Sequence, residues 1–271
     1  MTLHTKPKVL SSDYFPQEII AEALKQWDEI KAHLDISEQI AHIQKREFLN
    51  NVKLEVQGKI FRVKYYNYRS RFWHLLENLF YQSEAERNFR LMNYLCSIGI
   101  PTPKPVLLLE NTIAGMAMES ILIMEEIGLG KLYKDIISEI ESAHKELIKF
   151  LKDVFSSIAQ FNRTGLYSLD TDRNILIKRD NTKYKIYFFD FDNVFPFRKN
   201  NPRRAARTIY FLLRVRKIFK KFSPQEIEGL IELYLEQIGK KTWKKALLKE
   251  LKKVALRKNP EDFAWLKDKI G

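Results

Sequence analysis

The residues of this chain that are best suited to chemistry lie in two short stretches. The first is Asp170-Thr-Asp-Arg-Asn174, which leads into the apolar run Ile-Leu-Ile, and the second is Phe188-Phe-Asp190-Phe-Asp192. Asp190 follows Asn174 by 16 residues. Carboxylate and amide oxygens suit magnesium, a hard cation that binds oxygen and keeps several of its waters. Asn174 and Asp190 are therefore the candidate magnesium ligands.

The segment between these residues also predicts a β-hairpin. Its strands would be 174–178 and 183–189, joined by the turn 179–182. This order of Asp, Asn, hairpin and second Asp resembles kinase-fold phosphotransferases, in which such a hairpin lies between the metal ligands. In those enzymes the Asn and the second Asp, here Asn174 and Asp190, bind magnesium on the phosphates of ATP. The first Asp, here Asp170, accepts the proton of the substrate hydroxyl. Because Asp and Asn often flank strands, a hairpin without a metal site is the alternative.

Elements upstream must position a lysine against the same phosphates. Residues 51–56 and 59–66 alternate apolar and polar side chains around the turn Gln57-Gly58, which predicts a second hairpin. Lys64 stands at the end of its second strand and is the candidate ATP-binding lysine. A single lysine on a strand otherwise marks a solvated face, so this role depends on the position of Lys64.

A helix and two further strands should follow. The spacing of apolar residues predicts a helix over 83–98, which Gly99 ends. The short apolar runs 106–109 and 120–124 have the length of strands. Glu125 begins a turn-rich connection and is counted among the candidate nucleotide-binding residues.

This order of elements resembles the protein-kinase-like fold. Two stretches sharpen the resemblance: Arg87-Asn-Phe-Arg-Leu-Met-Asn-Tyr-Leu-Cys-Ser-Ile-Gly-Ile-Pro-Thr-Pro103, and the Asp190-Phe-Asp192 form of the metal motif. Both are similar to the lipopolysaccharide kinase family, which includes the kinases of Kdo (3-deoxy-D-manno-octulosonic acid) and of core heptose. The resemblance extends from Asn50 to Leu235.

The resemblance implies an α+β, two-lobed fold. A helical N-terminal extension (1–45) would precede a small antiparallel-sheet N-lobe (46–126) and a mostly helical C-lobe (127–271). The implied activity is phosphorylation by ATP and magnesium of a sugar hydroxyl in the lipopolysaccharide inner core, Kdo or heptose, on a lipid A precursor. The reaction would take place at the cytoplasmic face of a bacterial inner membrane. The alternatives are a kinase for an aminoglycoside-like or choline-like molecule, and a pseudokinase that binds nucleotide without turnover.

The catalytic loop departs from the family pattern. The family opens this loop with His-x-Asp and has Asn five residues after that Asp, whereas Tyr167-Ser-Leu-Asp170 lacks the histidine and Asn174 follows after four. Either the loop is one residue shorter, or Leu169, which cannot act as a base, takes the aligned position. We expect the shorter loop, with Asp170 as the base and Asp172 as the less favoured substitute. Without the histidine, Ser168 or a backbone contact must brace the loop.

The partner of Lys64 and the cover over the phosphates differ as well. On the predicted helix, the family's Glu falls opposite Asn88. Glu84, one turn earlier on the same face, is the better candidate partner, and Glu86 is the second. The segment 45–51 would have to cover the phosphates without any glycine.

The net charge of +13 is unevenly spread along the chain. Residues 240–258 hold nine Lys or Arg and one Glu, and their apolar residues repeat at helical spacing. Such a helix could bind anionic lipid, or it could pack its apolar stripe on the domain. A second basic cluster, from Arg203 to Lys217, could meet an anionic sugar or form a solvated helix face. Nucleic-acid binding is not expected, because neither a helix-turn-helix signature nor an RNA-recognition aromatic motif is found.

Length and composition fit a cytosolic protein with peripheral membrane contact. The 271 residues can form one two-lobed domain with a sizeable core. No apolar run approaches the ~20 residues needed to span a bilayer, and the start lacks the pattern of a secretory signal. The single Cys96 excludes an internal disulfide and predicts core packing. An amphipathic helix is predicted after Asp13 from Ile19, Ile20, Ala23, Leu24 and Trp27.

Overall fold

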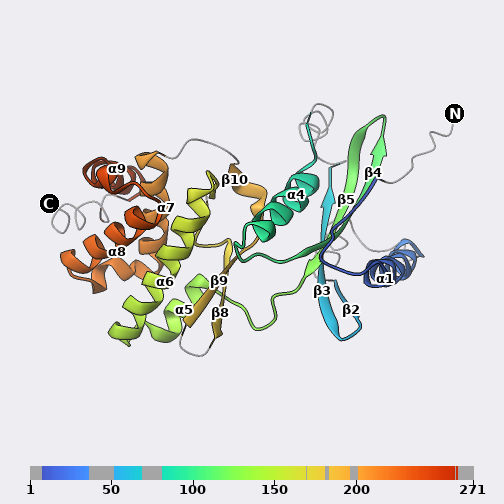
Figure 1. The fold of residues 1–271 in the computed structure, drawn as a ribbon, viewed down its shortest axis with the longest axis horizontal. Helices are drawn as coiled ribbons and strands as arrows, with labels where there is room; N and C mark the ends of the chain where they lie inside the picture. The colour runs from blue at the N-terminus through green and yellow to red at the C-terminus, as the bar shows by residue number, and fades with distance from the viewer. Residues whose placement is uncertain are drawn as a thin grey trace. The chain divides into compact units, whose positions relative to one another are not determined.

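The chain folds into two compact units that divide between Gly128 and Leu129. The computed structural model describes residues 8–36, 52–68, 81–168, 170–180, 183–195, 201–259 and 261, without the side chains of 30–36, 193 and 195. Within these described ranges, unit 1 contains a five-stranded antiparallel sheet with helices α1 and α4, and unit 2 contains two small sheets and helices α5 to α9 (Figure 1). The expected two-lobed α+β fold is therefore confirmed.

Five antiparallel strands form the sheet of unit 1, in the order β1-β4-β5-β3-β2. β4 and β5 contain the two predicted apolar runs, which lie in the middle of the sheet. The bounds of the strands are Lys8–Ser11 (β1), Lys53–Val56 (β2), Lys59–Asn67 (β3), Pro105–Ile113 (β4) and Met116–Glu125 (β5).

β2 and β3 form the predicted hairpin, and its turn residues Gln57 and Gly58 both have positive φ. The prediction that the second strand ends at Lys64 was wrong, because β3 continues to Asn67. Pairing with β5 explains the difference, since Lys64 faces Leu122 there and Asn67 faces Glu119. Lys64 therefore lies inside a strand that a neighbouring strand holds in place.

Helix α1 (Gln17–Ile36) covers one face of this sheet (Figure 1). Its apolar residues share a core with Phe61 and Val63 of β3. Four of the five residues that predicted the helix are buried and Leu24 is partly buried, so the amphipathic helix is confirmed. The sequence predicted only helix before residue 45. The structure adds β1, a strand of four residues that pairs with β4 far along the chain.

Helix α4 (Glu84–Ser97) lies on the other face of the sheet (Figure 1) and confirms the helix predicted over 83–98. Ser83 caps its N-terminus, because the Ser83 hydroxyl accepts a hydrogen bond from the N–H of Glu86 at 3.0 Å. Gly99 follows the end of the helix with φ of 77°, a conformation that costs glycine little.

Unit 2 contains the hairpin predicted from the candidate metal motif. β8 (Ile175–Asp180) and β9 (Lys183–Phe188) pair, β6 (Lys131–Leu132) adds a third strand, and β7 (Tyr167–Ser168) pairs with β10 (Val194–Phe195). The α-helices are α5 (Tyr133–Ile140), α6 (His144–Arg163), α7 (Pro202–Arg214), α8 (Pro224–Gln237) and α9 (Lys244–Lys258). In the described part of unit 2, the 3-10 helices are Phe191–Asn193 (η1), Val215–Lys221 (η2) and Lys241–Trp243 (η3).

Helix α6 anchors the hairpin of unit 2. Phe161 of α6 stacks on Phe188 of β9, with 4.4 Å between ring centroids. On the same helix, Asn162 Nδ2 donates to Tyr234 Oη of α8 at 2.8 Å, and both residues are buried. The hairpin therefore has a fixed base within unit 2.

The C-terminal helix α9 packs against α7 and α8 (Figure 1). Its apolar stripe is buried and consists of Leu247, Leu251, Val254 and Ala255. The alternative that this helix packs its apolar stripe on the domain is therefore confirmed, and most of its Lys and Arg side chains are exposed. Among the described helices, none combines the length and the apolar character needed to cross a membrane.

Candidate active site

The hairpin of unit 2 brings the two candidate metal ligands to one of its ends. β8 begins directly after Asn174, and Asp190 follows β9 by two residues. The N–H of Phe189 donates to the carbonyl oxygen of Asn174 at 3.0 Å, so the two segments still pair beyond the strands. Asp190 is the next residue, and it therefore leaves the hairpin beside Asn174.

Ser168 joins the two ends of the loop that precedes the hairpin. Its Oγ accepts hydrogen bonds from the N–H of Asp170 and from Asn174 Nδ2, both at 3.2 Å. Its carbonyl oxygen accepts a bond from Thr171 Oγ1 at 3.3 Å. Ser168 is itself held in β7, opposite Val194 of β10. The expectation that Ser168 braces this loop is confirmed.

Asp170 and Asp172 lie in the same loop, and both are half-buried. The carbonyl oxygen of Asp170 accepts bonds from the N–H groups of Arg173 at 2.9 Å and Asn174 at 3.2 Å, so a tight turn spans the four residues to Asn174. Burial, with the neighbouring charge of Asp170, raises the pKa of Asp172 above its usual range. Leu169, the other residue considered at the base position, lies outside the described residues.

Asp190 has an unusual backbone conformation. Its φ of 56° and ψ of 73° lie in the left-handed region, where Asp and Asn are enriched among residues other than glycine. Such strain costs on the order of 1–3 kcal/mol and clusters at functional sites. The buried ring of Phe191 anchors the turn η1 directly after it, whereas Asp190 is exposed. The strained backbone thus places an exposed aspartate at the end of the hairpin.

The donor atoms at this end of the hairpin fit magnesium. Asn174 Nδ2 bonds Ser168, which makes the side-chain oxygen the atom that can face a cation. Across the described ranges, no three or more His, Cys, Asp or Glu side chains cluster as a metal site. A sparse set of one amide and one carboxylate suits magnesium, because this ion usually takes one or two protein carboxylates together with substrate phosphates and waters.

In unit 1, Lys64 lies on the face of the sheet that α4 covers. Phe61 and Val63 of β3 are in the core beneath α1, and side chains alternate along a strand, so Lys64 and Tyr66 point to the opposite face. Tyr66 Oη accepts a bond from Asn88 Nδ2 of α4 at 2.8 Å. Lys64 Nζ lies 5.1 Å from the centroid of the Tyr66 ring. The candidate lysine is therefore close to Asn88, the position at which the family pattern has Glu.

Glu86 on α4 belongs to a buried ionic network. Lys8 Nζ of β1 lies 2.5 Å from Glu86 Oε2 and 3.3 Å from Glu110 Oε2. Arg90 bonds the other carboxylate oxygen of Glu86 at 2.8 Å. Burial alone would raise the pKa of Glu86, but the bonds from Lys8 and Arg90 outweigh it and hold this pKa below its usual value. Both oxygens of Glu86 are thus engaged by Lys8 and Arg90, and Glu84 stays the predicted partner of Lys64.

Glu110 completes this network at the N-terminus of α4. Its carboxylate accepts hydrogen bonds from the hydroxyls of Ser83, the α4 cap, and of Ser120 on β5, the latter at 2.9 Å. Ser83, Glu110 and Ser120 are all buried. Because Lys8, Glu86 and Glu110 lie on β1, α4 and β4, the network fixes α4 to the sheet. We term Lys8, Glu86 and Glu110 the α4 network.

The remaining candidate nucleotide-binding positions are only partly described. Glu125 ends β5, and its N–H donates to the carbonyl oxygen of Lys104 at 2.8 Å. The adjacent Glu126 pairs with Lys53 Nζ at 2.9 Å. The segment 45–51, expected to cover the phosphates, lies outside the described residues.

Comparisons with known proteins bear on the family and on the fold. A family model described as "Lipopolysaccharide kinase (Kdo/WaaP) family" matches residues 55–234. Among solved structures, WaaP in complex with acyl carrier protein matches with a TM-score of 0.52 and 12% identity, over 97% of this chain and 97% of that one. At this identity the structural match supports the fold. A search of curated proteins found no match.

Proposed function

The chain belongs to the lipopolysaccharide kinase (Kdo/WaaP) family, and we propose that it transfers the terminal phosphoryl group of ATP to a sugar hydroxyl of the lipopolysaccharide inner core. The acceptor would be Kdo or heptose on a lipid A precursor. Because that acceptor is a lipid, the protein would act at the cytoplasmic face of the inner membrane.

The observation that carries this proposal is the arrangement at the end of the β8–β9 hairpin. Asn174 and Asp190 lie side by side there, joined through the backbone bond from Phe189 to Asn174. Asp170 precedes Asn174 by one tight turn, and Ser168 holds both residues. A carboxylate base, a metal-binding amide and a metal-binding carboxylate, in this order along the chain, are the parts that kinase-fold phosphoryl transfer requires.

In the proposed mechanism, Asn174 and Asp190 would hold the magnesium that neutralises charge on the ATP phosphates. Asp170 would orient the acceptor hydroxyl and take its proton late in the reaction. By then the hydroxyl oxygen is forming its bond to the terminal phosphorus of ATP, and the bond from that phosphorus to ADP is breaking. Lys64 would bind the phosphates, with Glu84 as its partner. Ser168 would keep Asp170 and Asn174 at a fixed separation, which matters because phosphoryl transfer depends mainly on positioning.

The decisive test is transfer of labelled phosphate from ATP to Kdo-lipid A by purified protein with magnesium. Lys64→Ala and Asp190→Asn should abolish or strongly reduce the transfer without loss of folding. Labelling of a heptose-containing core acceptor, but not of Kdo-lipid A, would assign the heptose branch of the family. Labelling only of an aminoglycoside or choline would contradict the lipopolysaccharide acceptor. Binding of ATP with no transfer to any acceptor would identify a pseudokinase.

A further inference from the structure

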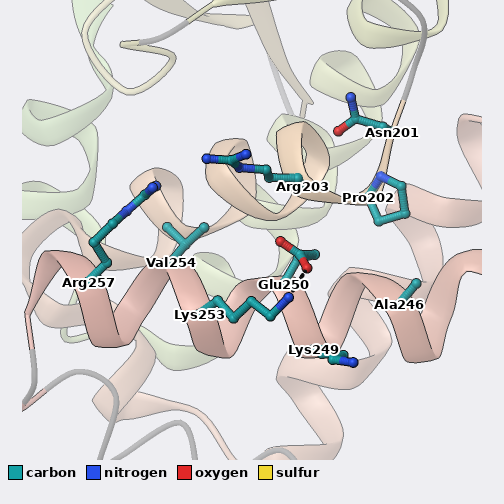
Figure 2. Close-up of a pocket in the computed structure, with 9 residues that line it drawn as sticks. All are labelled: Asn201, Pro202, Arg203, Ala246, Lys249, Glu250, Lys253, Val254 and Arg257. Atoms are coloured by element: carbon teal, nitrogen blue, oxygen red, sulfur yellow. Dashed lines mark hydrogen bonds and ion pairs between the residues drawn. The ribbon is translucent and has the colours of Figure 1, made fainter.

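The two basic clusters of the sequence meet in one groove of unit 2. Nine residues from the start of α7 and from α9 line a hollow of about 640 Å³ (Figure 2). Figure 2 shows Arg203 on the first turn of α7 above α9, which carries Lys249, Lys253 and Arg257. We call this hollow the α7/α9 groove. This meeting of the two clusters could not be predicted from the sequence, because α8 lies between α7 and α9 along the chain.

The α7/α9 groove is strongly positive. Its lining holds four cationic side chains, those of Arg203, Lys249, Lys253 and Arg257, and one carboxylate, Glu250. Glu250 pairs with Lys253 at 2.6 Å. Within the described ranges, no carboxylate forms an ion pair with the other three cations, and all four cationic residues are exposed. A site with this excess of unpaired positive charge is complementary to a phosphate group, which arginine can bind through two parallel hydrogen bonds.

The same face of α9 also exposes an apolar side chain. Leu256 is 51% exposed and lies three residues after Lys253 and seven after Lys249, which places it on their side of the helix. The groove itself includes the apolar residues Pro202, Ala246 and Val254. Cations next to an exposed aliphatic residue suit the boundary between lipid headgroups and acyl chains, where both kinds of group find a partner. A purely acidic protein surface would have no apolar group to contact the exposed leucine.

Size supports a headgroup as the occupant. A hollow of about 640 Å³ falls within the range of small-molecule sites, roughly 300–1,000 Å³. A planar membrane surface alone would not fill a hollow, whereas a protruding phosphate-bearing headgroup would. We propose that the α7/α9 groove binds the phosphate-bearing headgroup of an anionic membrane lipid. This goes beyond the phosphotransfer reaction and does not depend on it.

The test is binding of the full chain to vesicles, without nucleotide and at physiological ionic strength. Vesicles of phosphatidylcholine with phosphatidylglycerol should bind the protein, and vesicles of phosphatidylcholine alone should not. The triple variant Lys249→Gln, Lys253→Gln, Arg257→Gln should bind the anionic vesicles about 100-fold more weakly. This estimate takes about 1 kcal/mol of binding free energy for each cation near the surface, and roughly tenfold in affinity for every 1.4 kcal/mol.

A matched control separates the groove from net charge. The variant Lys145→Gln, Lys149→Gln, Lys152→Gln removes the same three charges from α6, where all three lysines are exposed and outside the groove lining. It should retain wild-type binding. Far-UV circular dichroism and thermal unfolding should show both triple variants folded. Equal weakening in the two variants would overturn the proposal in favour of diffuse electrostatic attraction.

Two further outcomes would assign the groove to another ligand. If free glycerol 1-phosphate displaces the protein from vesicles at concentrations comparable with those of the lipid phosphate, the groove is a site for a soluble phosphate. If the wild type does not bind the vesicles but binds polyglutamate, and the groove variant does not bind polyglutamate, the occupant is an acidic protein. Either result overturns the lipid proposal. All of these outcomes are independent of phosphotransfer, so they are distinguishable from failure of the proposed enzyme activity.

Discussion

The two units of this protein use charged side chains in opposite ways. In unit 1, Glu86 and Glu110 are buried, and Lys8 joins them in the α4 network. In unit 2, Asp190 is exposed at the end of the hairpin, and the cations of the α7/α9 groove are exposed as well. Buried charges need partners, because their ionised forms lose the stabilisation that water provides. Exposed charged residues stay accessible to a ligand in solution.

This difference separates stability from function. Substitution of a charge in the α4 network should destabilise unit 1 and displace α4. Substitution of the exposed charges at the end of the hairpin should change activity and leave the free energy of unfolding almost unaltered. Two results would contradict this comparison. One is that removal of an exposed charge in unit 2 unfolds the protein, and the other is that removal of a member of the α4 network leaves the free energy of unfolding unchanged.

The largest effect is expected for Asp190→Asn. Asn tolerates the left-handed backbone at this position but lacks the charge needed beside the ATP phosphates. The turnover number should fall about 10³-fold, the upper end of losses measured for a single electrostatic stabiliser. Steady-state kinetics with Kdo-lipid A would measure it.

Asp180→Asn is the control for Asp190→Asn. Asp180 is an exposed carboxylate at the other end of the same hairpin. Its variant should keep wild-type turnover, and the melting temperatures of both variants should stay near that of the wild type. If both variants lose activity equally, the hairpin and not the position of Asp190 is responsible.

The next largest effect is expected in the α4 network. Lys8→Met removes the cation shared by Glu86 and Glu110 and leaves two buried carboxylates short of a partner. Breaking a buried pair costs 3–5 kcal/mol, and because the Lys8 side chain is itself 40% exposed, we expect about 3 kcal/mol. Urea unfolding monitored by circular dichroism would measure the change.

Lys131→Met is the matched control for Lys8→Met. Lys131 pairs with Glu139 at 2.5 Å, but both side chains are about half exposed. An exposed ion pair of this kind contributes about 0–1 kcal/mol. Equal losses of stability in the two variants would show that burial does not distinguish the units.

Asp170 and Asp172 test the comparison inside a single loop. Asp170→Asn should reduce the turnover number about 10²-fold with little change in KM, because a carboxylate base contributes at the low end of general-base effects when the proton moves late. Asp172→Asn should reduce it little, since Asp172 lies on the turn itself, only two residues before Asn174. The reverse ranking would transfer the role of base to Asp172. Insensitivity to both substitutions would favour a pseudokinase.

Local patterns predicted the parts of this structure that local forces build. The hairpin after Asn174, the helix capped by Ser83 and the bracing role of Ser168 all depend on residues within a few positions of each other. The end of β3 at Asn67, and so the place of Lys64 inside the strand, was not predictable in the same way, because pairing with β5 from far along the chain determines it. Tertiary pairing of this kind overrides local strand preference.

The α4 network and the α7/α9 groove were missed for the same reason. Lys8 lies in a four-residue strand, Lys-Val-Leu-Ser, whose sequence does not alternate polar and apolar residues. Its partner Glu110 is brought to it only by the pairing of β1 with β4. Arg203 and Lys249 were visible as members of two basic clusters, but their meeting depends on how α9 packs against α7. Charge could be counted from the sequence, whereas burial and proximity required the fold.

The smallest effect is expected for Glu141→Gln, and its response to salt and pH sharpens the comparison most finely. Hydrogen bonds from Arg216 and Lys221 lower the pKa of Glu141 from 4.5 to about 2. A carboxylate whose pKa is lower in the folded state stabilises the fold above its unfolded pKa and loses this contribution as the pH falls. The stability advantage of the wild type over Glu141→Gln should therefore be present above pH 4.5 and vanish between about 4.5 and about 2. This stability advantage should also shrink in ~1 M salt, where the Debye length is near 3 Å, because the ion pair lies at the surface.

Glu86→Gln should show the same sign of pH dependence, since the pKa of Glu86 is lowered too. Its loss of stability should be larger, and salt should not remove it. Thermal unfolding of both variants at low and high salt would measure this contrast. Equal salt sensitivity in Glu86→Gln and Glu141→Gln would mean that solvent reaches the α4 network, and the proposed division between buried and exposed charge would fail.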